Sequence, residues 1–458
     1  MLRIFLFLCC LLAAPLAADT SVPQSQAEIS LSFAPLVKEA APAVVNIYAR
    51  RVVQARSPFA DDPFFGNFFR DFGSRPQVQN SLGSGVILSG DGIVVSNYHV
   101  VGQATDIRVV LNDRREFAAQ VLLGDEEADL AILQLDGAAH MPHLPLRDSD
   151  TVEVGELVLA IGNPFGVGQT VSSGIVSGLA RSGTATGNAR GYFIQTDAPI
   201  NPGNSGGALI DVAGRLIGVN TSILTRSGGS NGIGFAIPSA LVSQFVAQAR
   251  AGKTRFERPW AGLVGQPVDA DLSDSLGLGR PGGVLLAAVH PASAFAAAGL
   301  VAGDVVLSVD GQPVNTPAEM LFRMTVRGIG AEAEIAYVSR GETRVARVAM
   351  IAPPDDPPRE AVTLDRGAVL PGLSLARVNP AVAAEMGIEG APPDGVVVTD
   401  PGPYGARAGL RPGDILQAIN GRTVDAPGRV DAMLRRAAPR IDLDILRGNR
   451  RVALRFRV

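Results

Sequence analysis

The stretch GVILSGDGIVVSNYHVV, residues 85–101, carries the pattern that decides the fold. Two short apolar runs, 86–88 and 93–95, consist largely of β-branched residues and are separated by Ser, Gly and Asp. β-Branched side chains favour strands, and Gly and Asp favour tight turns, so the stretch predicts two short strands joined by a turn. A polar segment that contains His99 follows the second run directly.

The same texture extends over residues 82–240. Short apolar runs recur there without intervening helical patterns, at 107–110, 130–133, 157–160, 174–176, 216–219 and 234–237. Strands at this spacing indicate an all-β sandwich or a pair of barrels. On either side, residues 30–44 predict a short amphipathic helix leading into a strand at 44–48, and Ser239 is expected to cap a helix that extends to Arg250.

The C-terminal part of the chain is an internal repeat. The segment that begins at His290 recurs from Asp400 with a constant offset of 110 residues, with the identical pairs Pro291/Pro401, Ala298/Ala408, Gly299/Gly409, Leu300/Leu410, Gly303/Gly413, Asp304/Asp414, Gly311/Gly421 and Val314/Val424. Such a long period indicates two copies of a whole domain. Between the copies, the Pro-rich and acidic residues 353–360 predict a stiff, solvated linker.

Composition narrows the class of protein. With 458 residues and 47% hydrophobic content, the chain is long enough for two or three globular domains, which excludes disorder as its main state. The net charge is −4 and only 18% of residues are charged, so no basic surface for a nucleic-acid partner is implied. The 52 Gly, 32 Pro and 5% aromatic residues favour many tight turns between short strands.

The first 18 residues have the plan of a secretory signal peptide, which predicts export to the periplasm. Arg3 precedes an apolar run at 4–14, and Pro, Leu and Ala lead to Asp19. The run is short for a bilayer-spanning helix, although an uncleaved anchor is the alternative. Cys9 and Cys10 are the only cysteines, so cleavage leaves a chain without thiols, excluding a disulfide scaffold, thiol catalysis and Cys-type zinc sites. No later stretch predicts a membrane span.

Residues 51–80 form a segment rich in phenylalanine. Phe59, Phe64, Phe65, Phe68, Phe69 and Phe72 are six of the chain's 18 Phe and stand among Asp, Gly, Pro and Arg. A loop seldom exposes so much apolar surface, so it is expected to pack either on a partner subunit or on its own domain.

The segment 203–207, GNSGG, surrounds Ser205 with small residues. Such neighbours let backbone N–H groups converge on a developing oxyanion, and one such donor contributes about 2.7–4 kcal/mol of transition-state stabilisation. The letters also fit the Gly-x-Ser-x-Gly elbow of α/β-hydrolases, so an esterase is the alternative. That fold needs its histidine after the serine, and the only one there, His290, lies inside the repeat.

A nucleophilic serine needs a base, and imidazole suits that role near neutral pH. His99 follows a predicted strand, where its side chain is held at a strand end. His140 and His143 flank a proline and suggest a metal, but no third ligand accompanies them, so no metal or other cofactor is predicted.

Asp129 stands where a polar loop enters an apolar strand. A carboxylate in that position is drawn toward burial and needs a partner such as an imidazole N–H. The alternative role is a turn or cap residue, for which Asp125 is the better candidate.

At this point the chain resembles a periplasmic serine endoprotease of the Do/HtrA type, whose fold is a chymotrypsin-like double β-barrel. The residues that carry the resemblance are, in the family's order, 96–101 (SNYHVV), 128–131 (ADLA), 162–166 (GNPFG) and 196–207 (TDAPINPGNSGG). The resemblance implies that His99 is the general base, Asp129 its orienting residue and Ser205 the nucleophile. It also implies an oxyanion hole made by the backbone N–H groups of Gly203, Asn204 and Ser205.

The same resemblance implies further roles. Gln169–Arg181 and Ile223–Asn231 would be loops that order the site, and Ile200 would shape a small apolar pocket for the substrate residue before the scissile bond. The Phe-rich segment stands where the family has a regulatory loop. A homo-oligomer made of trimers, or of multiples of trimers, is implied in the same way.

The two repeats resemble PDZ domains, which receive an extended peptide C-terminus as an added strand. The matching loop of the second copy is Val369–Leu373, where Pro371 removes a backbone donor. The first copy is therefore expected to capture substrate and the second to serve assembly or regulation. The matching loop of the first copy is 258–265, with the peptide-binding candidates Trp260, Ala261, Gly262, Leu263, Val264 and Gly265.

The expected organisation is mainly β. It comprises a signal peptide at 1–18, a protease domain at 19–252, a first PDZ domain at 258–352, a linker at 353–363 and a second PDZ domain, a small α+β unit, at 364–458. The chain lacks the Gly-x-x-x-x-Gly-Lys-Ser/Thr phosphate loop, consistent with ATP-independent cleavage of misfolded or unfolded exported chains. The alternative function is a holdase chaperone or scaffold that binds unfolded chains through its PDZ domains.

Overall fold

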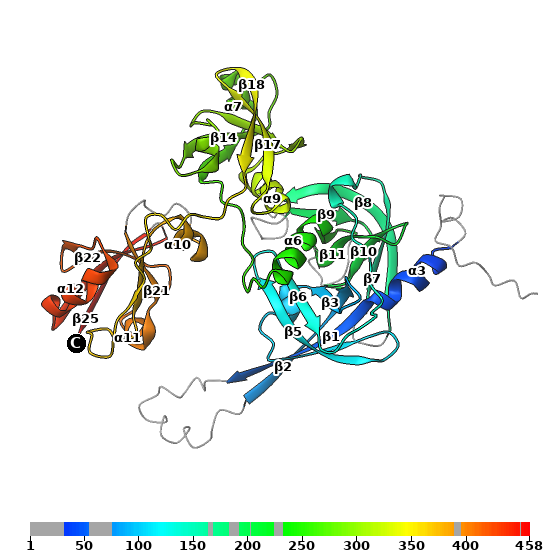
Figure 1. Cartoon of the computed structure of the whole chain (residues 1–458), viewed down its shortest axis with the longest axis horizontal. Coiled ribbons are helices and arrows are strands. Elements are labelled where there is room, and N and C mark those ends of the chain that lie inside the picture. The colour runs from blue at the N-terminus through cyan, green and yellow to red at the C-terminus, as the bar shows by residue number, and fades with distance from the viewer. Residues whose placement is uncertain are drawn as a thin grey trace, which may run out of the picture. The chain divides into compact units, whose positions relative to one another are not determined.

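The computed structural model describes residues 32–54, 76–163, 168–182, 192–201, 203–223, 232–388, 395–448 and 450–458. The predicted signal peptide and the Phe-rich stretch 55–75 lie outside the described residues. The chain divides into two compact units, residues 1–256 and 257–458 (Figure 1).

The first unit contains two closed six-stranded barrels, which confirms the predicted double β-barrel. The first barrel has the strand order β1-β2-β3-β6-β5-β4, and a long ribbon of β1 and β2 projects from it (Figure 1). Its strands are β1 (Val44–Gln54), β2 (Pro76–Ile87), β3 (Ile93–Ser96), β4 (Asp106–Val110), β5 (Glu116–Asp125) and β6 (Leu130–Leu135).

The second barrel has the order β10-β11-β12-β9-β8-β7. All residues of β10 and β12 are buried, as expected for strands that consist almost entirely of apolar residues. Its strands are β7 (Leu157–Gly162), β8 (Thr170–Ser182), β9 (Tyr192–Thr196), β10 (Ala208–Asp211), β11 (Leu216–Ile223) and β12 (Gly234–Pro238).

The two barrels share one apolar core, which α6 (Ser239–Arg250) closes. Ile132 of the first barrel and Phe235 of the second belong to this core together with Phe245 of α6. Phe245 stacks on Phe256 with ring centroids 3.8 Å apart, and burial of each such side chain contributes about 1.5–3 kcal/mol. The barrels are therefore held in one fixed arrangement, which a site assembled from both requires.

Two helix predictions need correction. The helix bounds at 239–250 are right, but Ser239 is the first helical residue rather than its cap, because its hydroxyl donates to the carbonyl of Arg147. Near the start of the described chain, the predicted helix is the shorter α3 (Ala34–Ala40), followed by a 3-10 turn at Ala41–Ala43. The strand that follows runs to Gln54 and not only to residue 48.

The second unit contains two modules that repeat one α+β plan. In the first module the main sheet path is β13-β14-β15-β17-β18, and β16 pairs with β15. Its elements are β13 (Leu263–Pro267), α7 (Ala270–Leu276), β14 (Val284–Val289), α8 (Ala294–Ala297), β15 (Val305–Val309), β16 (Gln312–Pro313), α9 (Pro317–Arg327), β17 (Glu332–Ser339) and β18 (Glu342–Ala349).

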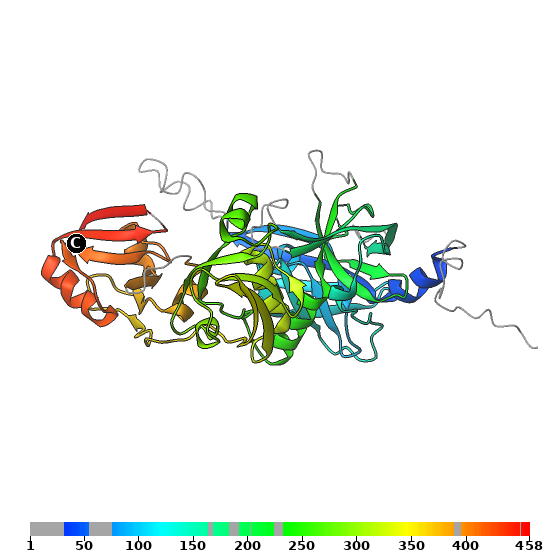
Figure 2. The same ribbon diagram turned by 90° about the horizontal axis from the view of Figure 1, so that it is seen from above.

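In the second module the path is β19-β20-β21-β22-β24-β25, with β25 at one edge, drawn in red in Figures 1 and 2. β15 and β22 occupy positions exactly 110 residues apart, as the sequence repeat predicts, whereas β19 has no strand counterpart in the first module. The elements are β19 (Val362–Thr363), β20 (Ser374–Arg377), α10 (Pro380–Glu385), β21 (Val396–Asp400), α11 (Gly402–Arg407), β22 (Ile415–Ile419), β23 (Arg422–Thr423), a 3-10 turn (Pro427–Arg429), α12 (Val430–Ala437), β24 (Arg440–Arg447) and β25 (Arg450–Arg457).

Candidate active site

His99 and Asp129 are in direct contact. His99 lies on the single-turn helix α5 (Tyr98–Val101) after β3, and its Nδ1 is 2.9 Å from both carboxylate oxygens of Asp129. Asp129 precedes β6 with φ +53°, and its Oδ1 also accepts the backbone N–H of His99 at 3.0 Å. With Nδ1–H donating to the carboxylate, Nε2 is left as the basic nitrogen, on a side chain that is 53% exposed.

The backbone of this corner holds Asp129 in place. The carbonyl of Asp129 accepts hydrogen bonds from the side-chain amide of Asn97 at 3.0 Å and from the backbone N–H of Tyr98 at 3.2 Å. Asp125, the alternative cap residue, accepts the N–H of Ala128 at 2.7 Å and so closes the preceding turn. The two aspartates therefore have different roles, and only Asp129 faces the imidazole.

Thr221 of β11 links Ser205 to the same carboxylate. The Ser205 hydroxyl donates to the carbonyl of Thr221 at 2.9 Å, while the Thr221 hydroxyl donates to Oδ2 of Asp129 at 2.6 Å. Among the described residues, no hydrogen bond joins Ser205 to His99. The structure thus brings the three predicted residues together around Thr221, with the serine hydroxyl turned toward β11. Sequence reasoning missed Thr221.

The loop around Ser205 has a defined set of backbone hydrogen bonds. The N–H of Asn204 donates to the carbonyl of Asn201 at 3.0 Å, and the N–H of Gly206 donates to Asn220 at 2.8 Å. The N–H of Asn204, one of the three expected oxyanion donors, is therefore engaged within the loop in this arrangement. The N–H groups of Gly203 and Ser205 have no partner among the described residues. Gly203 has φ +97°, which glycine adopts without strain.

Ser84 of β2 connects this loop to the first barrel. Its hydroxyl donates to the carbonyl of Gly203 at 2.7 Å and accepts the N–H of Asn163 at 2.8 Å. Its backbone N–H donates to the carbonyl of Ser205 at 2.9 Å, and its own carbonyl accepts the hydroxyl of Ser96 at 2.8 Å. Ser84 is fully buried, so these bonds are not shared with bulk water. Sequence reasoning did not single out this residue.

The two expected site-ordering loops have different outcomes. Gln169–Arg181 is almost entirely strand β8, paired with β7 and β9, because its Thr, Val and Ile residues favour extended backbone. The prediction of a loop there is wrong. One residue of β8, Thr170, donates to the side-chain oxygen of Asn204 at 2.8 Å and so reaches the nucleophile loop. Most of the other expected loop, 224–231, lies outside the described residues.

Ile200 is 1% exposed and belongs to the core of the second barrel. It faces the start of β12, where a Cβ on Gly234 would stand only 2.7 Å from its Cδ1. The space beside Ile200 is therefore available only because residue 234 has no side chain.

In the first C-terminal module, the candidate peptide loop leads into an open sheet edge. β13 pairs with β14 alone, and Val264 on it is 60% exposed. Gly262 has φ +62°, and its carbonyl accepts the N–H of His290 at 2.7 Å. Among the described residues, the N–H groups of Ala261 and Gly262 have no partner. Trp260 precedes them with its ring against that of His290, and Gly265 continues the strand.

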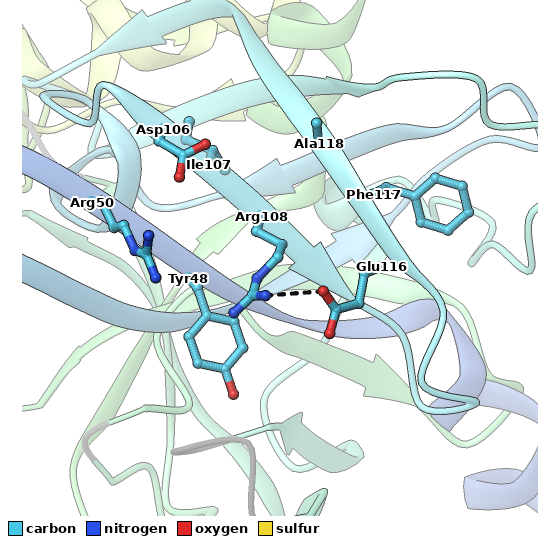
Figure 3. A pocket seen from close by; sticks show the side chains of 8 residues that line it. All are labelled: Tyr48, Arg50, Asp106, Ile107, Arg108, Glu116, Phe117 and Ala118. Carbon is cyan, nitrogen blue, oxygen red and sulfur yellow. Dashed lines mark hydrogen bonds and ion pairs between the residues drawn. The ribbon is translucent and has the colours of Figure 1, made fainter.

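A separate pocket of about 300 Å³ lies on the outer surface of β1, β4 and β5 (Figure 3). There Arg108 pairs with Glu116 at 3.0 Å, and its guanidinium stands 5.2 Å from the ring centre of Tyr48. None of the lining residues is a candidate catalytic residue. In the described part of the chain, no group of three or more His, Cys, Asp or Glu has the arrangement of a metal site.

The described helices include none that is long and apolar enough to cross a membrane. Residues 83–219 match the trypsin-like peptidase domain family, and residues 286–324 and 395–447 match the PDZ domain family.

Relatives match nearly the whole chain. A probable periplasmic serine protease do/HhoA-like of Haemophilus influenzae is 37% identical over 447 residues, 94% of this chain and 93% of that protein. The periplasmic pH-dependent serine endoprotease DegQ of Escherichia coli is 35% identical over 453 residues, 97% of this chain and 96% of DegQ. The solved structure of the HtrA-type protease AlgW with a decapeptide is 38% identical with a TM-score of 0.53, and covers 70% of this chain and 99% of that one. Together with the double barrel and the repeated PDZ module, these matches identify the chain as a member of the Do/HtrA family of periplasmic serine endoproteases.

Proposed function

We propose that His99, Asp129 and Ser205 are the catalytic triad of this endoprotease. The observation that supports this most directly is the contact of His99 Nδ1 with both oxygens of Asp129 at 2.9 Å. That contact fixes the tautomer in which Nε2 accepts a proton. The proposed mechanism requires the Ser205 hydroxyl to turn from the Thr221 carbonyl to this nitrogen.

The reaction then follows acyl-enzyme chemistry. Ser205 Oγ attacks the scissile carbonyl while its proton passes to His99 Nε2, and the C–O bond forms as the carbonyl oxygen becomes an oxyanion. The imidazolium returns the proton to the leaving amine when the C–N bond breaks. Water, deprotonated by His99, then attacks the ester and releases Ser205.

We assign the oxyanion hole to the backbone N–H groups of Gly203 and Ser205. Both lack a partner among the described residues, and the Ser84 hydroxyl holds the Gly203 carbonyl. Ile200, buried beside Gly234, would limit the pocket for the preceding substrate residue to small aliphatic side chains. A cleavage-site survey tests that preference, and cleavage mainly after Arg, Lys or Phe would contradict it.

The proposed substrates are misfolded or unfolded exported polypeptides with exposed C-termini. The open edge of β13 and the partnerless N–H groups of Ala261 and Gly262 suit an added strand that ends in a carboxylate. The similar protease AlgW was solved with a decapeptide. We therefore assign substrate capture to the first PDZ domain.

For the organisation of the chain we propose a signal peptide at 1–18, a protease domain at 19–252 and PDZ domains at 258–352 and 364–458. The division between residues 256 and 257 and the PDZ match to 286–324 are consistent with these bounds. We further propose a homo-oligomer made of trimers, with the Phe-rich segment 51–80 as its regulatory contact. Mass measurement of the native protein and of a variant lacking 57–74 tests both.

The deciding experiment compares Ser205→Ala with the unaltered chain on an unfolded reporter protein. Loss of degradation is expected, and a chain that degrades the reporter equally well after the change would contradict the assignment. Ser275→Ala is the matched control, because its hydroxyl only bonds within α7. Protection of the reporter from aggregation by Ser205→Ala would add the holdase role without altering the assignment of the nucleophile.

A further inference from the structure

The second PDZ domain carries an extra strand at the edge where a PDZ ligand would bind. β19 pairs antiparallel with β20, with Val362 opposite Leu375 and Thr363 opposite Ser374. β20 corresponds by position in the sheet to β13, whose equivalent edge is open in the first domain. The residues 110 positions before β19 follow α6 and form no strand.

The backbone of Leu364, directly after β19, engages the loop that would receive a ligand's carboxylate. Its N–H donates to the carbonyl of Leu373 at 2.9 Å, and its carbonyl accepts the N–H of Gly372 at 2.9 Å. The N–H of Leu373 donates to Leu370 at 3.2 Å, and Pro371 has no N–H. Each of the three donor positions that correspond to 261–263 is therefore absent or already used.

The Leu364 side chain also occupies the position of a ligand's terminal side chain. It is 7% exposed and belongs to the apolar cluster that includes Leu370 of the loop and Leu434 of α12. A PDZ ligand adds a strand to the sheet edge and places side chains in pockets beside it. Here a strand, a carbonyl in the carboxylate loop and a buried leucine all come from the same three residues of the chain.

We infer that Val362-Thr363-Leu364 is a resident internal ligand of the second PDZ domain, which closes that domain to free peptide C-termini. Substrate C-termini are therefore captured by the first PDZ domain alone, while the second binds its own chain.

The segment before β19 is attached to the same domain by side-chain contacts, although residues 355–358 and 360 are exposed to solvent. Arg359 makes a two-pronged ion pair with Glu385 of α10, with N–O distances of 2.9 and 3.0 Å. The side-chain amide of Asn379 donates to the carbonyl of Pro357 at 2.7 Å, and Arg377 pairs with Glu360 at 3.0 Å. These contacts align the chain along β20 and place Leu364 at the loop.

The test uses the full chain with Ser205→Ala, so that no probe is cleaved and the result does not depend on catalysis. The probe is a fluorescein-labelled peptide with the sequence of residues 358–364 and a free C-terminal carboxylate. Removing the resident side chain with Leu364→Ser is expected to add one binding equivalent and to increase affinity at the second domain at least tenfold. Leu416→Ser is the matched control, because it removes a buried leucine that belongs to β22 and not to the proposed internal ligand. It should add no binding equivalent.

Hydrogen exchange is measured on the chain that keeps Leu364, so its result does not depend on whether the Leu364→Ser variant folds. The amides of Leu364 and Gly372 should be protected without peptide, and the probe should leave their protection unchanged. A probe-dependent rise in protection at 372–375 in that chain, or a folded Leu364→Ser chain that gains no binding, would overturn the inference.

Discussion

The hydroxyl of Thr221 donates a hydrogen bond to Oδ2 of Asp129 at 2.6 Å, from the residue whose carbonyl accepts the hydroxyl of Ser205. Replacing Thr221 by valine keeps the shape and removes the donor, which leaves a carboxylate oxygen without one of its partners. Because Asp129 orients His99, we expect kcat to fall about tenfold, in line with the loss of one hydrogen bond to a charged group. Steady-state kinetics on a peptide substrate measure this.

Thr221→Ser is the companion variant, since it keeps the hydroxyl and should recover most of the activity. Equal kcat values for the valine variant and the unaltered chain would show that Asp129 does not need this donor.

Ser84→Ala should impair catalysis while leaving substrate binding nearly intact. The change removes the donor to the Gly203 carbonyl and the acceptor for the Asn163 N–H, so residue 203, whose own N–H is a proposed oxyanion donor, loses its side-chain link to the first barrel. Because a misplaced oxyanion donor affects mainly the transition state, we expect kcat to fall about tenfold or more with KM little changed.

Ser96→Ala is the control for Ser84→Ala, because the Ser96 hydroxyl bonds the carbonyl of Ser84 and does not bond the nucleophile loop. Affinity for a peptide boronate, whose tetrahedral adduct uses the oxyanion hole, should fall in parallel with kcat only in the Ser84 variant. Parallel losses in both variants would indicate general destabilisation instead.

Gly206→Ala should abolish labelling of Ser205 by a fluorophosphonate. Gly206 has φ +84°, and a Cβ there would collide with the carbonyl oxygen of Ser84. Gly137→Ala is the control that introduces backbone strain without a collision, because Gly137 has φ +67° and a Cβ there would meet no atom within 4 Å. It should cost only about 1–2 kcal/mol of stability and label normally. Normal labelling of Gly206→Ala would mean that the two barrels tolerate separation at this point.

Glu156 should make the stability of the protein depend on pH in the acid range. The hydrogen bond from Arg147 is the main cause that lowers the pKa of Glu156, and the two side chains meet at 2.6 and 2.9 Å, near Asp211. A carboxylate with a lowered folded-state pKa stabilises the fold above its ordinary pKa and loses that contribution as pH falls through the folded-state value.

Glu156→Gln should therefore lower the free energy of unfolding at pH 7 by about 1.5 kcal/mol and flatten its decrease below about pH 5. Urea unfolding between pH 3 and pH 8 measures both quantities. An unchanged acid slope would assign the dependence to other carboxylates.

The double barrel and the three candidate catalytic residues were predictable because strand-forming runs and rare residue types carry them. His99 is one of four histidines in the chain, and Ser205 has three glycines within two positions of it, at 203, 206 and 207. Asp129 is marked by the change from a polar loop to an apolar strand.

Thr221 and Ser84 carried no such signal. Each is an ordinary hydroxyl residue in a strand, and its importance comes from a neighbour far away in sequence. Ser84 and Gly203 are 119 residues apart, so only the closed barrels bring them together. The mistaken prediction of a loop at 169–181 has a different cause. It followed the family resemblance, although the β-branched residues of the segment favour a strand.

The contacts of the predicted linker could not be predicted for a third reason. Its Pro and Asp residues are typical of solvated chain. However, Arg359 can pair with Glu385, and the neighbouring Leu364 can pack in the apolar cluster, only after the second PDZ domain has folded. Composition describes what a segment does alone, and here its tertiary partners decide the outcome.

The bond between Ser84 and Gly203 bears on how a protease coexists with its own newly made copies. Each exported copy begins as an unfolded polypeptide, the proposed substrate of the mature enzyme. Because the first barrel supplies Ser84 and the second supplies Gly203, neither half can shape the nucleophile loop by itself. An immature copy in which the two barrels have not yet packed together should therefore be unable to cleave another copy.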